Sequence, residues 1–139
     1  MPTPWKPENW PTLTPAIPGG ARLIDFLMKV FDAKPMHVFE MENRAVARAE
    51  IRIGDSLVIT GDPVGPRTTP PGSLLIYVAD CDATYQRAVK AGATSKQAPQ
   101  DQFYGDRTAH VIDPFGNQWS IATHKEDVSA EEMNRRMGK

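Results

Sequence analysis

The chain has 139 residues, of which 40% are hydrophobic and 24% are charged, with a formal net charge of −1. This composition excludes a disordered chain, and the balanced charge gives no basic field to hold nucleic acid or an anionic membrane. A single cysteine, Cys81, excludes an internal disulfide framework and a cysteine-rich zinc site. No apolar run approaches the roughly 20 residues of a membrane span. We expect a reduced, cytoplasmic protein with neither nucleic acid nor a membrane as partner.

Residues 1–18 form a proline-rich arm that also holds two tryptophans. The prolines predict an extended path, with an edge strand possible within residues 12–17, and the tryptophans predict that the arm docks on something. From Gly19 a helical pattern follows, with apolar residues on one face and charged residues on the other. Pro35 ends this predicted helix.

Three strands are expected after the helix, at residues 36–41, 45–53 and 56–60. The last two are joined by the tight turn Gly54-Asp55. Within residues 45–53, charged and apolar residues alternate, which predicts one apolar face in the core and one polar face. The charged residues of that face are Arg48, Glu50 and Arg52.

A Pro/Gly-rich linker at residues 62–72 separates the two halves of the chain. The second half repeats the order of the first. Its expected elements are a strand at 73–78, a helix that begins near Asp80 or Asp82 with Tyr85, Ala88 and Val89 on its apolar face, strands at 94–98, 108–113 and 118–123 with a turn at 114–117, and a polar tail with helical potential at 129–137.

Each half therefore reads β-α-β-β-β, and the two turns match at an offset of 62 residues, Gly54-Asp55 with Gly116-Asn117. We predict an α+β fold of two tandem βαβββ modules in one structural domain. They would form a curved, cup-shaped mixed sheet with helices on the convex face and a ligand in the concave one. The predicted parts are the arm with the first strand (1–18), the first module (19–61), the linker (62–72), the second module (73–124) and the polar tail (125–139).

Five stretches of the sequence carry a resemblance to a known family. They are Ala49–Ser56 (AEIRIGDS), Leu75–Asp80 (LIYVAD) with Asp82-Ala83, Asp101–Arg107 (DQFYGDR), Asp113–Gly116 (DPFG) and Trp119–Asp127 (WSIATHKED). In this order, over residues 12–128, they resemble the vicinal-oxygen-chelate superfamily of glyoxalase I, bleomycin-resistance proteins, fosfomycin-resistance enzymes and extradiol dioxygenases, and within it the PhnB-like branch. The fold hosts many chemistries, so the resemblance does not by itself assign a reaction.

The resemblance implies a divalent metal held by His and Glu from the first and last strands of each module. The residues at these positions are Thr14, Pro15 or Ala16, Ile59 or Thr60, Leu74 or Leu75, and Ser120. None is a ligand of the expected type. Arg48 stands where PhnB-like chains often have His, and a guanidinium cannot ligate a metal. The three histidines, His37, His110 and His124, are scattered. We therefore predict no metal and no cofactor.

Two groups of residues are candidates for ligand binding. Arg48 would bind a carboxylate or phosphate, with Glu50 holding it in place or acting as a base, and the alternative is a solvated row of charges. Phe103, Tyr104 and Arg107 precede a strand in a loop expected at the mouth of the cup. Their alternative role is structural, with the aromatic rings covering the end of the sheet and Arg107 bonded within the turn.

His110 and Ser120 complete the candidate set. By the resemblance, Ser120 faces the cup and Trp119 the core, and the same alternation puts Tyr77 in the core. His110 lies on a strand that can face the cup, and packing or surface exposure is its alternative. Cys81 is expected to be a buried, unreactive thiol, so no catalytic residue is assigned.

Three functions remain open from the sequence. The first is a homodimeric, metal-free module that binds a small organic molecule, with an anionic molecule as one option, in the manner of bleomycin-resistance proteins. The second is an enzyme of lyase, transferase or dioxygenase type, either metal-dependent or using Arg48 and Glu50. The third is a scaffold without a small ligand. A homodimer is expected because the sheet edges and the arm would gain from a twofold partner.

Overall fold

The computed structural model describes residues 6–7, 10–63 and 68–138. They divide into two compact units. The N-terminal unit runs to Gly72 and includes the turn Phe115–Asn117, and the C-terminal unit holds the rest. None of the described helices is long and apolar enough to cross a membrane.

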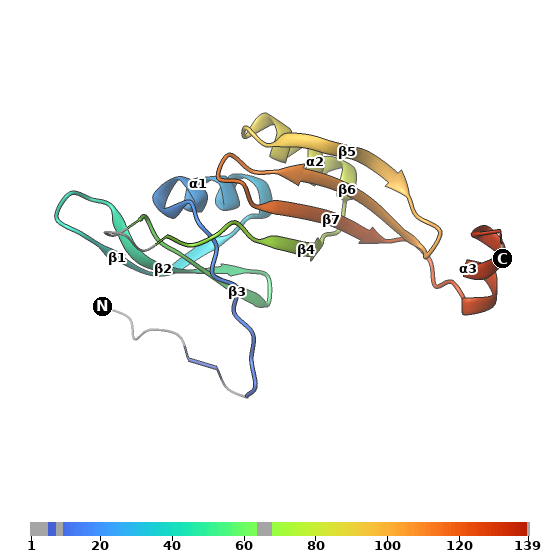
Figure 1. The fold of residues 1–139 in the computed structure, drawn as a ribbon, viewed down its shortest axis with the longest axis horizontal. Helices are drawn as coiled ribbons and strands as arrows, with labels where there is room; N and C mark the ends of the chain where they lie inside the picture. The colour runs from blue at the N-terminus through green and yellow to red at the C-terminus, as the bar shows by residue number, and fades with distance from the viewer. Residues whose placement is uncertain (1–5, 8–9, 64–67, 139) are drawn as a thin grey trace. The chain divides into compact units, whose positions relative to one another are not determined.

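The N-terminal unit packs one helix on a three-stranded antiparallel sheet of order β1-β2-β3 (Figure 1). Its elements are α1 (Gly20–Phe31), β1 (Lys34–Glu40), β2 (Val46–Ile53) and β3 (Ser56–Thr60). The predicted apolar face of α1 is confirmed, since Leu23, Leu27 and Val30 are buried. The helix ends at Phe31, and Pro35 lies beyond it in the edge strand β1, where a missing N–H is tolerated.

The end of the arm, residues 15–17, pairs with the outer edge of β3. Ile17 N–H donates to the carbonyl of Ile59, whose own N–H donates to the carbonyl of Pro15, at 2.9 and 2.8 Å. These two bonds make one parallel bridge, so the predicted edge strand is reduced to a single contact. Trp5 lies outside the described residues, and Trp10 is exposed rather than docked.

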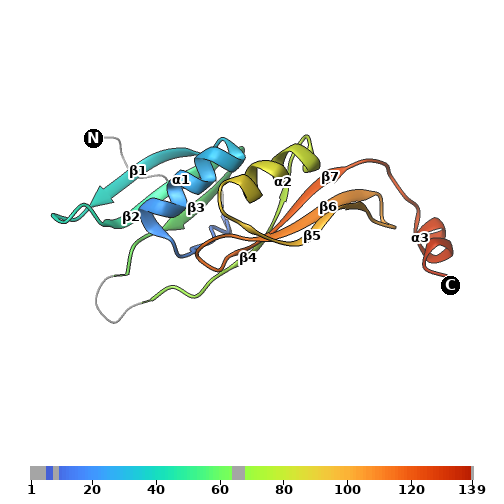
Figure 2. The same cartoon turned by 90° about the horizontal axis from the view of Figure 1, so that it is seen from above.

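The C-terminal unit has a four-stranded sheet of order β4-β7-β6-β5, with β4 parallel to β7 (Figure 2). Its elements are β4 (Ser73–Tyr77), α2 (Cys81–Lys90), β5 (Thr94–Asp101), β6 (Asp106–Ile112), β7 (Gln118–His124) and α3 (Ala130–Arg136). Asp80 caps α2 by accepting a hydrogen bond from Ala83 N–H at 3.1 Å. The buried residues of α2 are Cys81, Thr84 and Ala88. The predicted apolar face was thus wrong at Val89, which is exposed.

Both units share one strand order, in which the first segment runs parallel to the last strand and the others follow antiparallel. The predicted fold class is therefore confirmed. The offset of 62 residues between the two halves was wrong by one residue. It pairs Val58 with Ser120, although these two side chains lie on different faces of their sheets. Val58 shares the α1-packed face with Thr60, whose hydroxyl accepts from Gly20 N–H, whereas Ser120 lies opposite the buried Trp119. A slip of one residue moves a side chain to the other face.

We call the sheet face of the C-terminal unit that is not packed against α2 the open face. By strand alternation and register its residues are Leu75, Tyr77, Asp106, Thr108, His110, Ser120, Ala122 and His124.

A close backbone approach at Gly105 ties the loop before β6 to the segment after β7. Gly105 has φ 101°, and its carbonyl accepts hydrogen bonds from Lys125 N–H and Glu126 N–H. A Cβ at Gly105 would lie 2.1 Å from the carbonyl oxygen of Glu126. Only glycine fits this position without moving the backbone.

We predict that Gly105→Ala destabilises the protein more than Gly54→Ala. Gly54 also has a positive φ, 58°, but a Cβ there would meet nothing within 4 Å, so only the backbone term of about 1–2 kcal/mol applies. The clash at Gly105 adds about 1–3 kcal/mol. Urea unfolding of the two variants measures the difference, and equal losses would contradict the close approach.

Candidate functional site

Strand pairing places apolar and polar side chains next to one another in one strip across the open face. Leu75 on β4 pairs with Ser120 on β7, which pairs with His110 on β6. Leu75 and Tyr77 are 58% and 60% exposed. The prediction that Tyr77 lies in the core was therefore wrong. The parallel register of β4 and β7 places Tyr77 opposite Ala122, on the same face as Ser120.

His110 and Ser120 form a direct hydrogen bond across this strip. Nδ1 of His110 lies 2.8 Å from Oγ of Ser120, and both residues are half-buried. The hydroxyl fixes the orientation of the imidazole ring, which makes no other hydrogen bond to the described residues. The Nε2 of His110 thus stays available to donate or accept a hydrogen bond, according to the tautomer.

A chain of hydrogen bonds occupies the neighbouring part of the open face. Oδ2 of Asp106 accepts from the Tyr77 hydroxyl at 2.7 Å, and Oδ1 lies 2.9 Å from Nδ1 of His124. Nε2 of His124 lies 2.8 Å from Asp127. Asp106 is buried, whereas His124 is half-exposed. Sequence reasoning missed this group, because its members lie far apart in the chain.

The charges in this chain of bonds shift the pKa of three groups. Hydrogen bonds from His124 and then Tyr77 lower the pKa of Asp106. Asp106, followed by Asp127, raises the pKa of His124. The pKa of Tyr77 is raised mainly by its hydrogen bond to Asp106, with a smaller contribution from Tyr104. Near neutral pH the arrangement favours an imidazolium held between two carboxylates.

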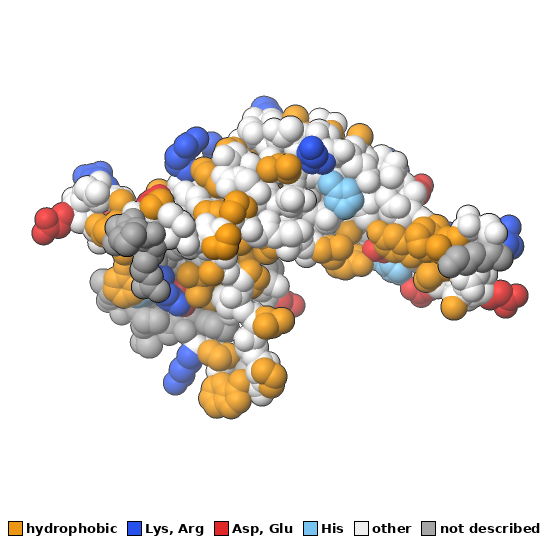
Figure 3. Space-filling model, in the orientation of Figure 1, with side chains coloured by type: hydrophobic (Ala, Val, Ile, Leu, Met, Phe, Trp, Pro, Cys, Tyr) orange, Lys and Arg blue, Asp and Glu red, His pale blue; other side chains and the backbone are white. Residues whose placement is uncertain are grey.

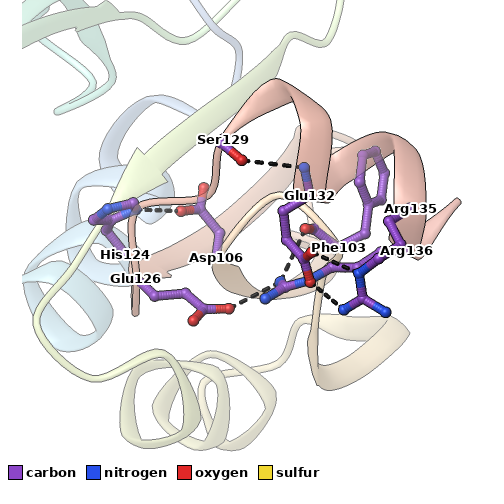
Figure 4. A network of polar contacts seen from close by, with 8 residues as sticks. All are labelled: Phe103, Asp106, His124, Glu126, Ser129, Glu132, Arg135 and Arg136. Carbon is purple, nitrogen blue, oxygen red and sulfur yellow. Dashed lines mark hydrogen bonds and ion pairs between the residues drawn. The ribbon is translucent and has the colours of Figure 1, made fainter.

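The loop residues Phe103 and Tyr104 stack edge to face, with ring centroids 5.2 Å apart. The backbone of this loop is held by the tail, since Arg136 donates to the carbonyl of Phe103 at 3.1 Å and pairs with Glu126 at 2.9 Å (Figure 4). Glu132 on the same helix accepts from Arg135 and Arg136, which lower its pKa to about 2. The predicted tail helix is confirmed as α3, capped by Ser129.

Arg107 lies apart from the open-face residues. Its guanidinium bonds to Asp82 at the start of α2, at 2.9 Å, and to Asp101 at 3.2 Å. These two carboxylates raise its pKa further. The alternation along β6 puts Arg107 on the side opposite His110. Its bond to Asp101 is of the kind that the structural alternative expects within the turn, whereas its bond to Asp82 joins the turn to α2.

The N-terminal unit holds the other predicted candidates, Arg48 and Glu50. Glu50 is 0% exposed, with Oε1 lying 3.6 Å from Nη1 of Arg48 and 3.8 Å from Nδ1 of His37. The alternative of a solvated row of charges does not hold at Glu50. His37 is buried edge-on against Phe39, with ring centroids 4.3 Å apart, and its Nδ1 makes no hydrogen bond to any residue that the structure describes. The side chain of Arg48 is part-exposed, and the buried carboxylate of Glu50 lies beside its guanidinium.

Cys81 does not provide a nucleophile. Its thiol is buried, and Sγ lies 3.3 Å from the carbonyl oxygen of Ile121, to which it donates. Burial, followed by Asp82, raises the pKa of the thiol. A protonated, covered thiol is unreactive.

The donor atoms do not fit the metal site that the resemblance implies. Ser120 is bonded to His110, and the Thr60 hydroxyl accepts from Gly20 N–H on the α1 side. Leu75 and Ile59 carry no donor. Among residues 6–7, 10–63 and 68–138, no group of three or more His, Cys, Asp or Glu is placed to hold a metal ion.

The group around His124 predicts a definite pH dependence of stability. Because the pKa of His124 is raised on folding, its ion pairs stabilise the fold fully below the pKa of an unfolded histidine, about 6.5, and this stabilisation is lost as the pH rises through the folded pKa. The pKa of Asp106 is lowered, so its contribution is present above about pH 3.9 and lost in stronger acid.

We therefore expect His124→Gln to destabilise the protein more at about pH 5.5 than at about pH 9. Urea unfolding at the two values measures the difference. Lys125→Gln, which removes a neighbouring exposed positive charge, is the control and should show no such dependence. A loss that is larger at the alkaline value would refute the arrangement.

Comparisons with known proteins agree with this geometry. The model of the Glyoxalase/Bleomycin resistance protein/Dioxygenase superfamily matches residues 17–121. An uncharacterized protein of Mycobacterium bovis is 34% identical, over 91% of this chain and 92% of its own. The anthracycline biosynthesis protein DnrV of Streptomyces peucetius is 35% identical over 80 residues, 56% of this chain and 29% of that protein.

Two solved structures share the fold. TioX from Micromonospora sp. ML1 has a TM-score of 0.66 at 21% identity, over 85% of this chain and 99% of that one. A glyoxalase/bleomycin resistance protein/dioxygenase family enzyme from Burkholderia phytofirmans PsJN has a TM-score of 0.63 at 18% identity, over 81% and 95%. The strand order and the family match lead to one conclusion: this chain belongs to the glyoxalase/bleomycin resistance protein/dioxygenase superfamily.

Proposed function

We propose that the protein binds a small organic molecule on the open face of the C-terminal unit, without a metal ion. The observation that carries this proposal is the exposure of Leu75 and Tyr77 beside the His110–Ser120 pair. Ligand sites combine apolar surface with a few placed polar groups, and this strip has that composition. Covering Leu75 and Tyr77 would supply affinity, and His110 would orient the ligand.

The N-terminal unit has a separate candidate partner for an anionic group in Arg48. Its guanidinium is part-exposed and supported by the buried Glu50, so it is held ready for a carboxylate or phosphate. The burial of Glu50 favours this binding role over an enzyme that uses Glu50 as a base, because a base must reach its substrate. A relative named for anthracycline biosynthesis also supports a role with small organic molecules.

We predict that the protein binds at least one member of a panel of benzoate, indole-3-acetate, cholate and glucose 6-phosphate. Ser120→Ala should weaken that binding about 2- to 10-fold, because the imidazole of His110 loses its fixed orientation. Ser95→Ala is the matched control, since Ser95 bonds to Tyr85 on the α2 side, at 2.7 Å. Thermal shift and titration calorimetry measure both variants.

Metal analysis of the same protein, purified without chelator, completes the test. We expect less than a tenth of an equivalent of any transition metal. A stoichiometric metal would favour the metal-dependent enzyme instead. No response to any panel member would favour the scaffold.

We also propose that the chain forms a homodimer. Trp10 and Leu13 in the arm are exposed, and Figure 3 shows hydrophobic side chains projecting from the arm. Large apolar side chains on an extended arm are typical of an interface. The edge of β1 gives a second surface that a partner would cover.

Light scattering at micromolar concentration should give twice the 15.4 kDa of the chain. The double substitution Trp10→Ser with Leu13→Ser should weaken the dimer, because it removes the apolar surface of the arm. Replacing the exposed Val89 on α2 with Ser is the control and should leave the mass unchanged. A monomer from the unmodified chain would refute the proposal.

A further inference from the structure

The side chain of Tyr77 crosses the sheet instead of pointing away from it. Tyr77 on β4 pairs with Ala122 on β7, and Ala122 pairs with Thr108 on β6. The Tyr77 hydroxyl nevertheless donates to Oδ2 of Asp106 at 2.7 Å. Asp106 lies on β6, two residues before Thr108 in the chain. The phenol ring therefore spans β7 and lies over Ala122.

The burial of the two side chains agrees with a ring that lies flat. Ala122 belongs to the open face but is 0% exposed, as expected if the ring lies over it. Tyr77 itself remains more than half exposed. One face of the ring thus rests on the small side chain of Ala122, and the opposite face is presented outward.

The ring is held at both ends. Its Cβ belongs to β4, and its hydroxyl donates to a buried carboxylate whose second oxygen is bonded to His124 at 2.9 Å. Hydrogen bonds to a charged acceptor are stronger than neutral ones. The ordering of the ring thus precedes any ligand, and a ligand that stacks on it loses less entropy on binding.

We propose that the outward face of Tyr77 is a stacking platform, which selects ligands with a planar aromatic ring system whose polar edge reaches His110. This inference rests on the proposed function and names the class of ligand. Aromatic rings gain from offset stacking beyond the area that they bury. Leu75 lies two residues along β4 on the same face and extends the apolar surface toward Ser120. Two residues of a strand cover about 6.6 Å, a length comparable to two fused six-membered rings.

The test compares 2-naphthoate with decahydro-2-naphthoate. Both carry a carboxylate on the same carbon skeleton, but only the first is planar and has an aromatic face that can stack. We expect the unmodified protein to bind 2-naphthoate roughly 3- to 10-fold more tightly. Tyr77→Leu should abolish this preference, because it keeps apolar bulk without a ring. Tyr77→Phe should retain part of it, because the ring stays but loses its bond to Asp106.

Tyr85→Leu is the matched control. Its hydroxyl also makes a 2.7 Å hydrogen bond, to Ser95, but it lies on α2 away from the open face. This variant should keep the full preference for the planar ligand. A merely structural role of Tyr77 would weaken both ligands alike, so the ratio of the two affinities is the decisive measurement.

The outcomes separate this inference from the proposed function. Equal binding of the two naphthoates, or a preference that survives Tyr77→Leu, would overturn the platform and leave the binding function standing. Absence of 2-naphthoate binding at millimolar concentration, with a response to cholate or glucose 6-phosphate, would do the same. Absence of binding by every compound would overturn both.

Discussion

The open face of the C-terminal unit depends on one buried carboxylate. Asp106 accepts a hydrogen bond from Tyr77 through one oxygen and contacts His124 through the other. A buried charge is tolerated only when it is paired and hydrogen-bonded, and these two partners meet that condition. The same two bonds orient the aromatic ring on β4 and anchor the end of β7. The open face and the attachment of the tail therefore both depend on Asp106.

The N-terminal unit shows the same principle with different residues. Glu50 is fully buried on the polar face of β2 and lies near both His37 and Arg48. Arg48 stands where the resemblance to PhnB-like chains implies a histidine. A fixed guanidinium supplies positive charge without a bound ion, which agrees with the lack of suitable donors at Ile59 and Thr60.

The sequence was sufficient to predict the elements, because their local patterns are strong. The spacing of Leu23, Leu27 and Val30 indicated α1, and Gly54-Asp55 marked the hairpin before β3. The faces were harder to predict. Alternation shows which residues of a strand share a face, but not which face a helix covers, so Tyr77 was placed in the core. The register of β4 on β7 places Tyr77 on the open face, and no local sequence pattern encodes that register.

The candidate site was predictable only in part. His110 and Ser120 were both named from the sequence, and the pairing of β6 with β7 brings them together. Arg107 was grouped with Phe103 and Tyr104 because they are neighbours in the chain. The guanidinium of Arg107 instead lies on the other side of the sheet, where it bonds to Asp82, 25 residues away in the chain. Contacts across such separations depend on the tertiary fold and leave no signal in composition or periodicity.

The helix α3 buries none of its residues, and Arg136 ties it to the rest of the unit by bonds to the Phe103 carbonyl and to the Glu126 carboxylate. Attraction between exposed charges is screened over about 3 Å in molar salt, compared with about 10 Å at 0.1 M. A rise in ionic strength should therefore loosen this helix from the sheet. In concentrated brine the carboxyl-terminal segment should become open to a protease while the core of the C-terminal unit remains intact.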